Sequence, residues 1–149
     1  MGLKSILKKH KRLMIDTSPI IYFIEESEKY LSVIQGIFEY GKKDGNQLFT
    51  SVITLSEVLT QPLKNNRNDL VEKYKNFLLS SDDFTVYSID PLISEKSALL
   101  RARYSIRTPD AIQLAVGIEN NATLFVTNDT KLKKIKEIDV FVLQDYNNT

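Results

Sequence analysis

The chain contains no cysteine, and this absence removes several kinds of chemistry at once. Without thiols there can be no disulfide framework, thiolate nucleophile, iron–sulfur cluster or cysteine-ligated zinc site. Histidine is almost absent as well, because His10 is the only one among 149 residues. A catalytic histidine pair and a histidine-rich metal site are therefore excluded. A metal bound here would have oxygen ligands, which favours Mg²⁺ or Mn²⁺.

Long apolar runs are also lacking. No uninterrupted apolar segment approaches the roughly 18 residues that a membrane-spanning helix needs. The first residues are basic, but no apolar stretch of the signal-peptide type follows them. We therefore expect no membrane association and a cytoplasmic location. The length suits one domain with its own core, and no repeat, low-complexity tract or Gly/Ser-rich linker divides it.

The formal net charge of +1 gives no overall sign of nucleic-acid binding. The basic residues are nevertheless unevenly distributed, in an N-terminal cluster (Lys4, Lys8, Lys9, Lys11, Arg12) and a C-terminal cluster (Lys131, Lys133, Lys134, Lys136). Taken alone, each cluster is typical of a solvated surface. We expect a basic N-terminal extension over residues 1–11, one domain over 12–144 and a short tail over 145–149.

Short apolar segments alternate with amphipathic ones along the chain. The expected strands cover residues 13–15, 47–51, 84–89, 124–126 and 140–143. Helices are expected at 17–24, 31–41, 54–61, 70–79, 91–104, 108–120 and, as a short basic turn, 132–135. Strands separated by helices predict a parallel sheet with helices on both faces.

Four acids stand where these strands end or these helices begin: Asp16, Glu57, Asp110 and Asp129. Each has a local structural explanation. Asp16 and Asp129 could form turns or caps, although Thr17 could cap the first helix and leave Asp16 free. Asp110 suits the first turn of a helix, where an acid gains about 0.3–1 kcal/mol. Glu57 completes an S/T-x-x-E capping box that begins at Thr54.

The four acids also share a location. In a parallel sheet the carboxyl ends of the strands, and the starts of the helices that follow them, lie at one edge. Clustered carboxylates repel one another, and a divalent cation relieves that repulsion. A cation held by carboxylates can activate water and hydrolyse a phosphodiester, and lysines would then contact the phosphates. The pattern therefore indicates a metal-dependent phosphodiesterase.

Four segments in order, MIDTS, SEVLTQP, RTPDAIQLA and LFVTND, resemble the PIN-domain nucleases. The similarity is greatest to the small toxins of bacterial VapBC-type toxin–antitoxin pairs, and it extends from Leu13 to about Leu143. The resemblance implies a three-layer α/β/α sandwich with a central, mainly parallel sheet. It also implies metal-dependent endoribonuclease activity.

The family's acidic quartet falls on Asp16, Glu57, Asp110 and Asp129 of this chain. By this resemblance the quartet holds one or two Mg²⁺ or Mn²⁺ ions. Glu57 would either complete the ligand set or accept a proton from the attacking water. The neighbouring polar residues Thr17, Thr127 and Asn128 would orient carboxylates and bound waters. His10 receives no role.

The resemblance further implies an RNA substrate, a homodimer, and a cognate antitoxin whose C-terminal segment covers the acidic site. An RNA-processing PIN-domain nuclease without a toxin role stays open as an alternative. A non-catalytic, receiver-like acidic pocket is disfavoured, because Ile15 stands where that class has a second acid and Gln144 where it has a lysine. A degenerate PIN domain that only binds RNA is disfavoured by the presence of all four acids.

Overall fold

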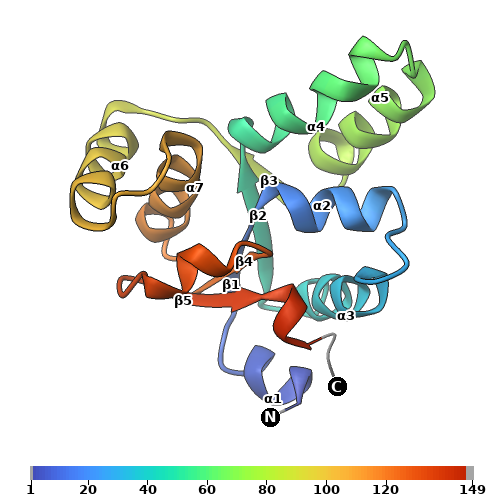
Figure 1. Ribbon diagram of the computed structural model, residues 1–149. Coiled ribbons are helices and arrows are strands. Elements are labelled where there is room, and N and C mark those ends of the chain that lie inside the picture. The colour runs from blue at the N-terminus through green and yellow to red at the C-terminus, as the bar shows by residue number, and fades with distance from the viewer. Residues whose placement is uncertain (1, 147–149) are drawn as a thin grey trace.

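A five-stranded parallel sheet forms the centre of the computed structural model, which describes residues 2–146 (Figure 1). Its strands are β1 (Arg12–Ile15), β2 (Gln47–Ser51), β3 (Phe84–Tyr87), β4 (Leu124–Thr127) and β5 (Asp139–Val142), in the spatial order β3-β2-β1-β4-β5. All four neighbouring pairs run parallel, which confirms the expected sheet. Most of the tail expected at 145–149 lies outside the described residues.

Helices cover both faces of the sheet, and the fold is the expected three-layer α/β/α sandwich (Figure 1). The central strand β1 shows the reason in its sequence. Leu13 and Ile15 belong to the core on one face and Met14 to the core on the other, and all three are fully buried. A strand that is covered on both sides is apolar at every position, as parallel sheets require.

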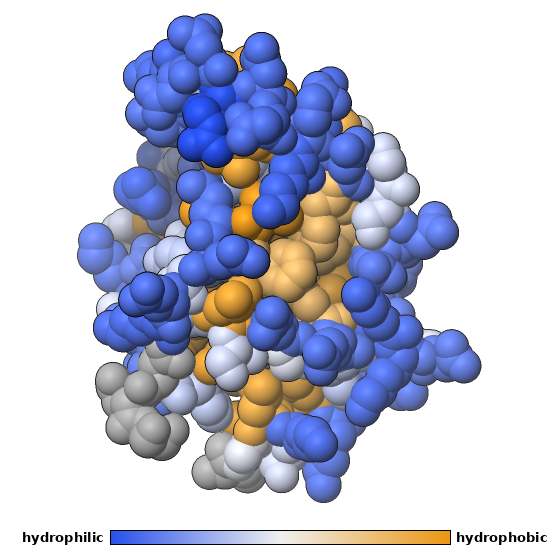
Figure 2. Space-filling view, turned by 90° about the vertical axis from the view of Figure 1, so that its right-hand side faces the viewer, coloured by the Kyte–Doolittle hydropathy of each residue, from blue (hydrophilic) through white to orange (hydrophobic). Residues whose placement is uncertain are grey.

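One face is covered by α2 (Thr17–Ile24), α3 (Leu31–Gly41), α5 (Asn68–Lys75) and the π-helical turn Asn76–Ser80. Four phenylalanines, Phe23, Phe38, Phe77 and Phe84, contact one another there and border a groove of about 190 Å³. Figure 2 shows apolar side chains reaching the surface on this side of the molecule. The other face is covered by α6 (Pro91–Tyr104) and α7 (Thr108–Glu119).

The structure differs from the sequence-based expectation at α4 (Val52–Lys64). We expected Thr54 to cap this helix and Pro62 to end it. The N-cap is instead Ser51, the last residue of β2, whose hydroxyl accepts the backbone N–H of Ile53 at 3.1 Å. The chain therefore passes from strand to helix without a loop. The helix also continues through the buried Pro62 into its last turn.

The first residues form a helix, α1 (Leu3–Leu7), that packs on α3. Leu7 is buried in the same core as α2 and α3, so part of the segment expected as an extension packs with the domain. The remaining elements are two 3₁₀ turns, η2 (Thr130–Lys134) and η3 (Leu143–Tyr146). No helix within residues 2–146 is both long and apolar enough to cross a bilayer.

Candidate functional site

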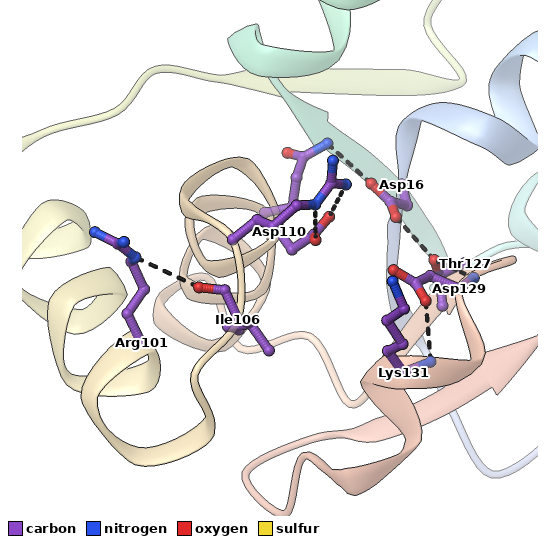
Figure 3. Close-up of polar contacts among 9 residues, drawn as sticks. Asp16, Arg101, Ile106, Asp110, Thr127, Asp129 and Lys131 are labelled. Carbon is purple, nitrogen blue, oxygen red and sulfur yellow. Dashed lines mark hydrogen bonds and ion pairs between the residues drawn. The ribbon is translucent and has the colours of Figure 1, made fainter.

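A cavity of about 660 Å³ opens at the carboxyl ends of β1 and β4. All seven residues expected at the site line it: Asp16, Thr17, Glu57, Asp110, Thr127, Asn128 and Asp129. They come from four separate parts of the fold, namely the β1–α2 junction, α4, the start of α7 and the end of β4. Figure 3 shows Asp16, Thr127 and Asp129 on one side and Asp110 on the other. The topology thus brings together residues more than 110 positions apart in sequence.

Asp16 follows β1 and is itself the N-cap of α2. Its Oδ1 accepts the backbone N–H of Thr17 at 2.9 Å, and its Oδ2 accepts the hydroxyl of Thr127 at 2.8 Å. The expectation that a hydroxyl would cap this helix and leave Asp16 free is therefore wrong. The carboxylate caps the helix through Oδ1, and Asp16 also lines the cavity.

Burial raises the pKa of the Asp16 carboxyl to about 6, although the hydrogen bonds from Thr127 and Thr17 oppose the rise. The negative charge of Asp110 adds to it. Both causes penalise the ionised form of Asp16, the form that could bind a cation. A positive charge in the cavity would remove that penalty.

Glu57 lies on α4 and accepts the hydroxyl of Thr17 at 2.7 Å. The capping-box interpretation of Glu57 is wrong, because α4 begins at Val52 and Thr54 is an interior residue of the helix. The buried hydroxyl of Thr54 contacts that of Thr17 at 3.0 Å. The two threonines thereby connect α2 to α4 beside the Glu57 carboxylate.

Gln113 is a residue of this cluster that sequence reasoning missed. Its side chain is buried, and its Nε2 donates to Thr54 Oγ1 at 2.7 Å and to Asp16 Oδ1 at 3.4 Å. Its Oε1 accepts the hydroxyl of Ser51. Gln113 stands three residues after Asp110 on α7, so the two share one face of that helix. That spacing is the signal in the sequence that could have found it.

Arg107 is the second residue that sequence reasoning missed. Its Nε lies 3.0 Å from Asp110 Oδ2 and its Nη2 lies 3.3 Å from Asp110 Oδ1, so both carboxylate oxygens are engaged. The contact with Asp110 raises the pKa of the Arg107 guanidinium, and the charges of Asp129 and Glu57 raise it further. One guanidinium thus lies in the field of three carboxylates.

The loop after β4 is fixed by its own hydrogen bonds. Asp129 Oδ1 accepts the backbone N–H of Lys131 at 2.9 Å and so caps η2. Asn128 accepts the backbone N–H of Gln144 at 2.9 Å and donates to the Tyr22 hydroxyl at 3.3 Å. Asn128 therefore anchors the loop to the chain after β5 and to α2, whereas Thr127 contacts the Asp16 carboxylate directly.

The donors at the cavity are carboxylate and hydroxyl oxygens, and this set fits a hard divalent cation. Within residues 2–146, no three acidic or histidine side chains are arranged as a ready-made metal site. Asp110, Glu57 and Asp129 each engage a donor from the protein. To hold one ion together, these side chains would have to move toward one another, and Asp110 would give up Arg107 for the ion.

The two basic clusters lie in different places relative to the cavity. Lys131 of the C-terminal cluster lines the cavity, and Lys133 of the same cluster pairs with Asp145 at 2.7 Å. The N-terminal cluster ends at Arg12, which begins β1, whereas Asp16 follows the end of that strand. The N-terminal cluster therefore lies toward the amino ends of the strands, opposite the cavity.

Comparison with known proteins gives one family and several solved structures of similar fold. The family model described as the PIN domain matches residues 13–138. The crystal structure of VapBC2 from Rickettsia felis bound to a DNA fragment from their promoter superposes with a TM-score of 0.69 and 20% identity, covering 88% of this chain and 98% of that one. A toxin–antitoxin complex from Klebsiella pneumoniae gives a TM-score of 0.65 and 24% identity, covering 88% and 96%. No curated protein matches by sequence.

Proposed function

Since the chain belongs to the PIN-domain family, we propose that it is a metal-dependent endoribonuclease and the toxin of a VapBC-type toxin–antitoxin pair. PIN-domain nucleases are hydrolases that act on nucleic acids, and PIN domains generally use divalent metal ions. The observation that carries the proposal is the convergence of four carboxylates on one cavity. The family and the site therefore point to the same chemistry.

In this proposal Asp16, Asp110 and Asp129 hold Mg²⁺ or Mn²⁺. The bound cation supplies the activation of water and the neutralisation of charge that phosphodiester hydrolysis needs. Glu57 either completes the ligand set or accepts a proton from the attacking water, and the Thr17 hydroxyl holds it in place. The expected products carry 5′-phosphate and 3′-hydroxyl ends.

Two residues orient Asp16 in the proposed site. The Thr127 hydroxyl and the Gln113 amide both donate to its carboxylate, and Gln113 is in turn fixed by Ser51 and Thr54. Buried groups of this kind keep a ligand in one orientation and tune its affinity for the metal. Asn128 has a different task, because it fixes the loop that carries Asp129.

RNA is the proposed substrate, and the lysines nearest the acids support it. Lys131 lines the acid cavity, and Lys134 lies in a smaller cavity that adjoins it. Lysines bind phosphates without regard to sequence. The N-terminal cluster lies at the start of β1, whereas Asp16 follows the end of that strand. The cluster would therefore contact RNA only well away from the cleaved bond.

The toxin assignment is supported by the two similar structures, of which one contains VapBC2 and the other is a toxin–antitoxin complex. We propose a homodimer and an antitoxin whose C-terminal segment covers the acid cavity; the cytoplasmic location stays a prediction. An RNA-processing role without an antitoxin would use the same site. Co-expression with the product of the neighbouring gene distinguishes the two, because only an antitoxin would co-purify and stop cleavage.

Replacement of one proposed ligand tests the activity itself. Asp129→Asn keeps the volume and the η2 cap but removes a charge, so we expect cleavage of total RNA in Mn²⁺ to fall by more than about 100-fold. EDTA should have the same effect on the unaltered protein. Asp82→Asn, at an exposed acid elsewhere, is the matched control and should cleave normally. Cleavage that persists in both EDTA and Asp129→Asn would overturn the proposal.

A further inference from the structure

Arg107 lies at the junction of two cavities. Together with Asp110, Asp129 and Lys131 it lines the acid cavity. The same four residues also line a cavity of about 150 Å³ that continues past Ile106 to Lys134. The smaller cavity thus adds Lys134 to the cations near Arg107, while Asp110 and Asp129 line both cavities.

The grip of Arg107 on Asp110 uses both oxygens of the carboxylate, in the two-pronged geometry that guanidinium groups prefer. Only 12% of the Asp110 side chain is exposed, against 75% of the Arg107 side chain. The carboxylate is thus covered largely by the protein and its arginine, whereas the guanidinium has little else to hold it. Movement of Arg107 would expose the Asp110 carboxylate, whose charge a cation would then have to neutralise in place of the arginine.

A second Arg–Asp pair provides a comparison for the Arg107–Asp110 pair. Arg67 grips Asp69 with the same geometry at the start of α5, at 3.0 and 2.9 Å. There the acid is 70% exposed, and exposed pairs of this kind contribute little to stability. Arg67 also has one further acid, Glu25, near it, but neither residue of that pair lines the acid cavity. Arg107, in contrast, lies near three of the four acids that line this cavity.

We propose that Arg107 exchanges partners: it holds Asp110 while the cavity is without metal, and it binds a phosphate of the RNA once a divalent cation takes Asp110. The inference rests on the proposed function and assigns that site a substrate-binding residue. A guanidinium binds carboxylates and phosphates with the same two-pronged geometry. The smaller cavity beyond Ile106 is lined by Lys131 and Lys134 as well as by Asp110 and Asp129. An RNA phosphate bound there by Arg107 would therefore also lie near two lysines once the cation neutralises the acids.

This exchange predicts effects of opposite sign on two ligands. Because the cation must displace Arg107 from Asp110, loss of the guanidinium should tighten metal binding. Because Arg107 then holds a phosphate, the same loss should weaken RNA binding. An arginine that only stabilised the start of α7 would change neither affinity in this paired way.

Calorimetric titration of Mn²⁺ into metal-free protein, followed by RNA cleavage at saturating Mn²⁺, tests the exchange. We expect Arg107→Gln to bind Mn²⁺ on the order of fivefold more tightly and to raise KM for RNA by a similar factor or more. Arg67→Gln removes the comparison pair and should change neither value. Arg107→Lys keeps the charge but loses the two-pronged geometry, so its Mn²⁺ affinity and its KM should fall between those of Arg107→Gln and the unaltered protein. It replaces Arg107→Gln in the test if that variant does not fold.

The possible results separate the inference from the proposed function. Equal Mn²⁺ affinity in Arg107→Gln and the unaltered protein would overturn the exchange, while cleavage by both would leave the nuclease intact. Tighter Mn²⁺ binding with an unchanged KM would overturn the phosphate contact. Absence of Mn²⁺ binding and of cleavage in every form, the unaltered protein included, would contradict the proposed function itself.

Discussion

The charged residues at the two ends of β1 lie in opposite environments. At its start, Arg12 donates through Nε and Nη2 to the carbonyl of Asn120 at 2.9 and 2.8 Å, and its guanidinium lies 5.0 Å from the centre of the Phe49 ring. At its far end, Asp16 lies beside other acids. The Arg12 charge contacts hydrogen-bond acceptors and an aromatic ring, whereas the Asp16 charge lies close to the like charge of Asp110.

The difference separates a structural end of β1 from the end where the proposed site lies. A hydrogen bond to a charged group contributes about 1.5–3 kcal/mol. The two Arg12 bonds share one carbonyl oxygen and together contribute about as much as one, so Arg12 stabilises the fold. The pKa of Asp16 rises from 3.8 to about 6, so at neutral pH its ionised form destabilises the metal-free fold by up to about 3 kcal/mol. We infer that the protein tolerates this instability because the same charge serves its ligand.

The largest expected effect comes from Asp16→Asn, which would remove the mismatch. Asparagine also caps helices and has nearly the same volume, so in EDTA at pH 7.5 the variant should gain up to about 3 kcal/mol in free energy of unfolding. Chemical denaturation measures this. If the variant were no more stable than the unaltered protein, the Asp16 charge would not destabilise the fold, and the difference drawn between the two ends of β1 would be wrong.

The pH dependence of that gain has a definite sign. A carboxyl whose folded-state pKa is raised contributes its full stability below the unfolded value near 3.8 and loses it as the pH rises through about 6. The advantage of Asp16→Asn should therefore shrink between pH 7.5 and pH 4. Asp82→Asn, an exposed acid, should show no such trend.

The next largest effect is expected at the start of β1, and it is a loss of stability. Arg12→Ala removes two hydrogen bonds to the Asn120 carbonyl and the contact with Phe49, and we expect a loss of about 2 kcal/mol. Once folded, the variant should bind Mn²⁺ normally. Lys11→Ala, at the exposed neighbouring position, is the control. A defect in Mn²⁺ binding rather than in stability would contradict the separation of the two ends.

The smallest effect is expected at Gln113, which orients Asp16 without belonging to the proposed ligand set. Gln113→Leu keeps an apolar contact on α7 but removes the donor to Asp16 and Thr54. Mn²⁺ affinity should fall about tenfold. Gln61→Leu, on the exposed side of α4, should leave it unchanged. An unaltered affinity in Gln113→Leu would show that Thr127 alone suffices to orient Asp16.

The sheet and the convergence of the acids could be predicted because both follow from general rules. Alternating strands and helices imply parallel strands, and parallel strands deliver Asp16 and Asp129 to one edge. The helix caps were less predictable. Asp16, Thr17 and Ser18 are all good caps, and Ser51 could equally end a strand or begin a helix. Local sequence does not choose among such neighbours.

Gln113 was missed for a different reason. Its partners Ser51 and Thr54 precede it by about 60 residues, so its role exists only once β2, α4 and α7 have packed together. Arg107 could have been found, because it stands three residues before Asp110 at the start of a helix. The segment RTPD contains this cation as well as the acid.

The central position of β1 also has a consequence for the order in which the protein is made. β1 leaves the ribosome among the first segments, yet one of its two neighbours is β4, more than 100 residues later. The Asp16–Thr127 contact and the site of Asp129 therefore form only when synthesis is almost complete. A nascent or prematurely ended chain therefore lacks Thr127 and Asp129, and with them two of the residues that line the acid cavity.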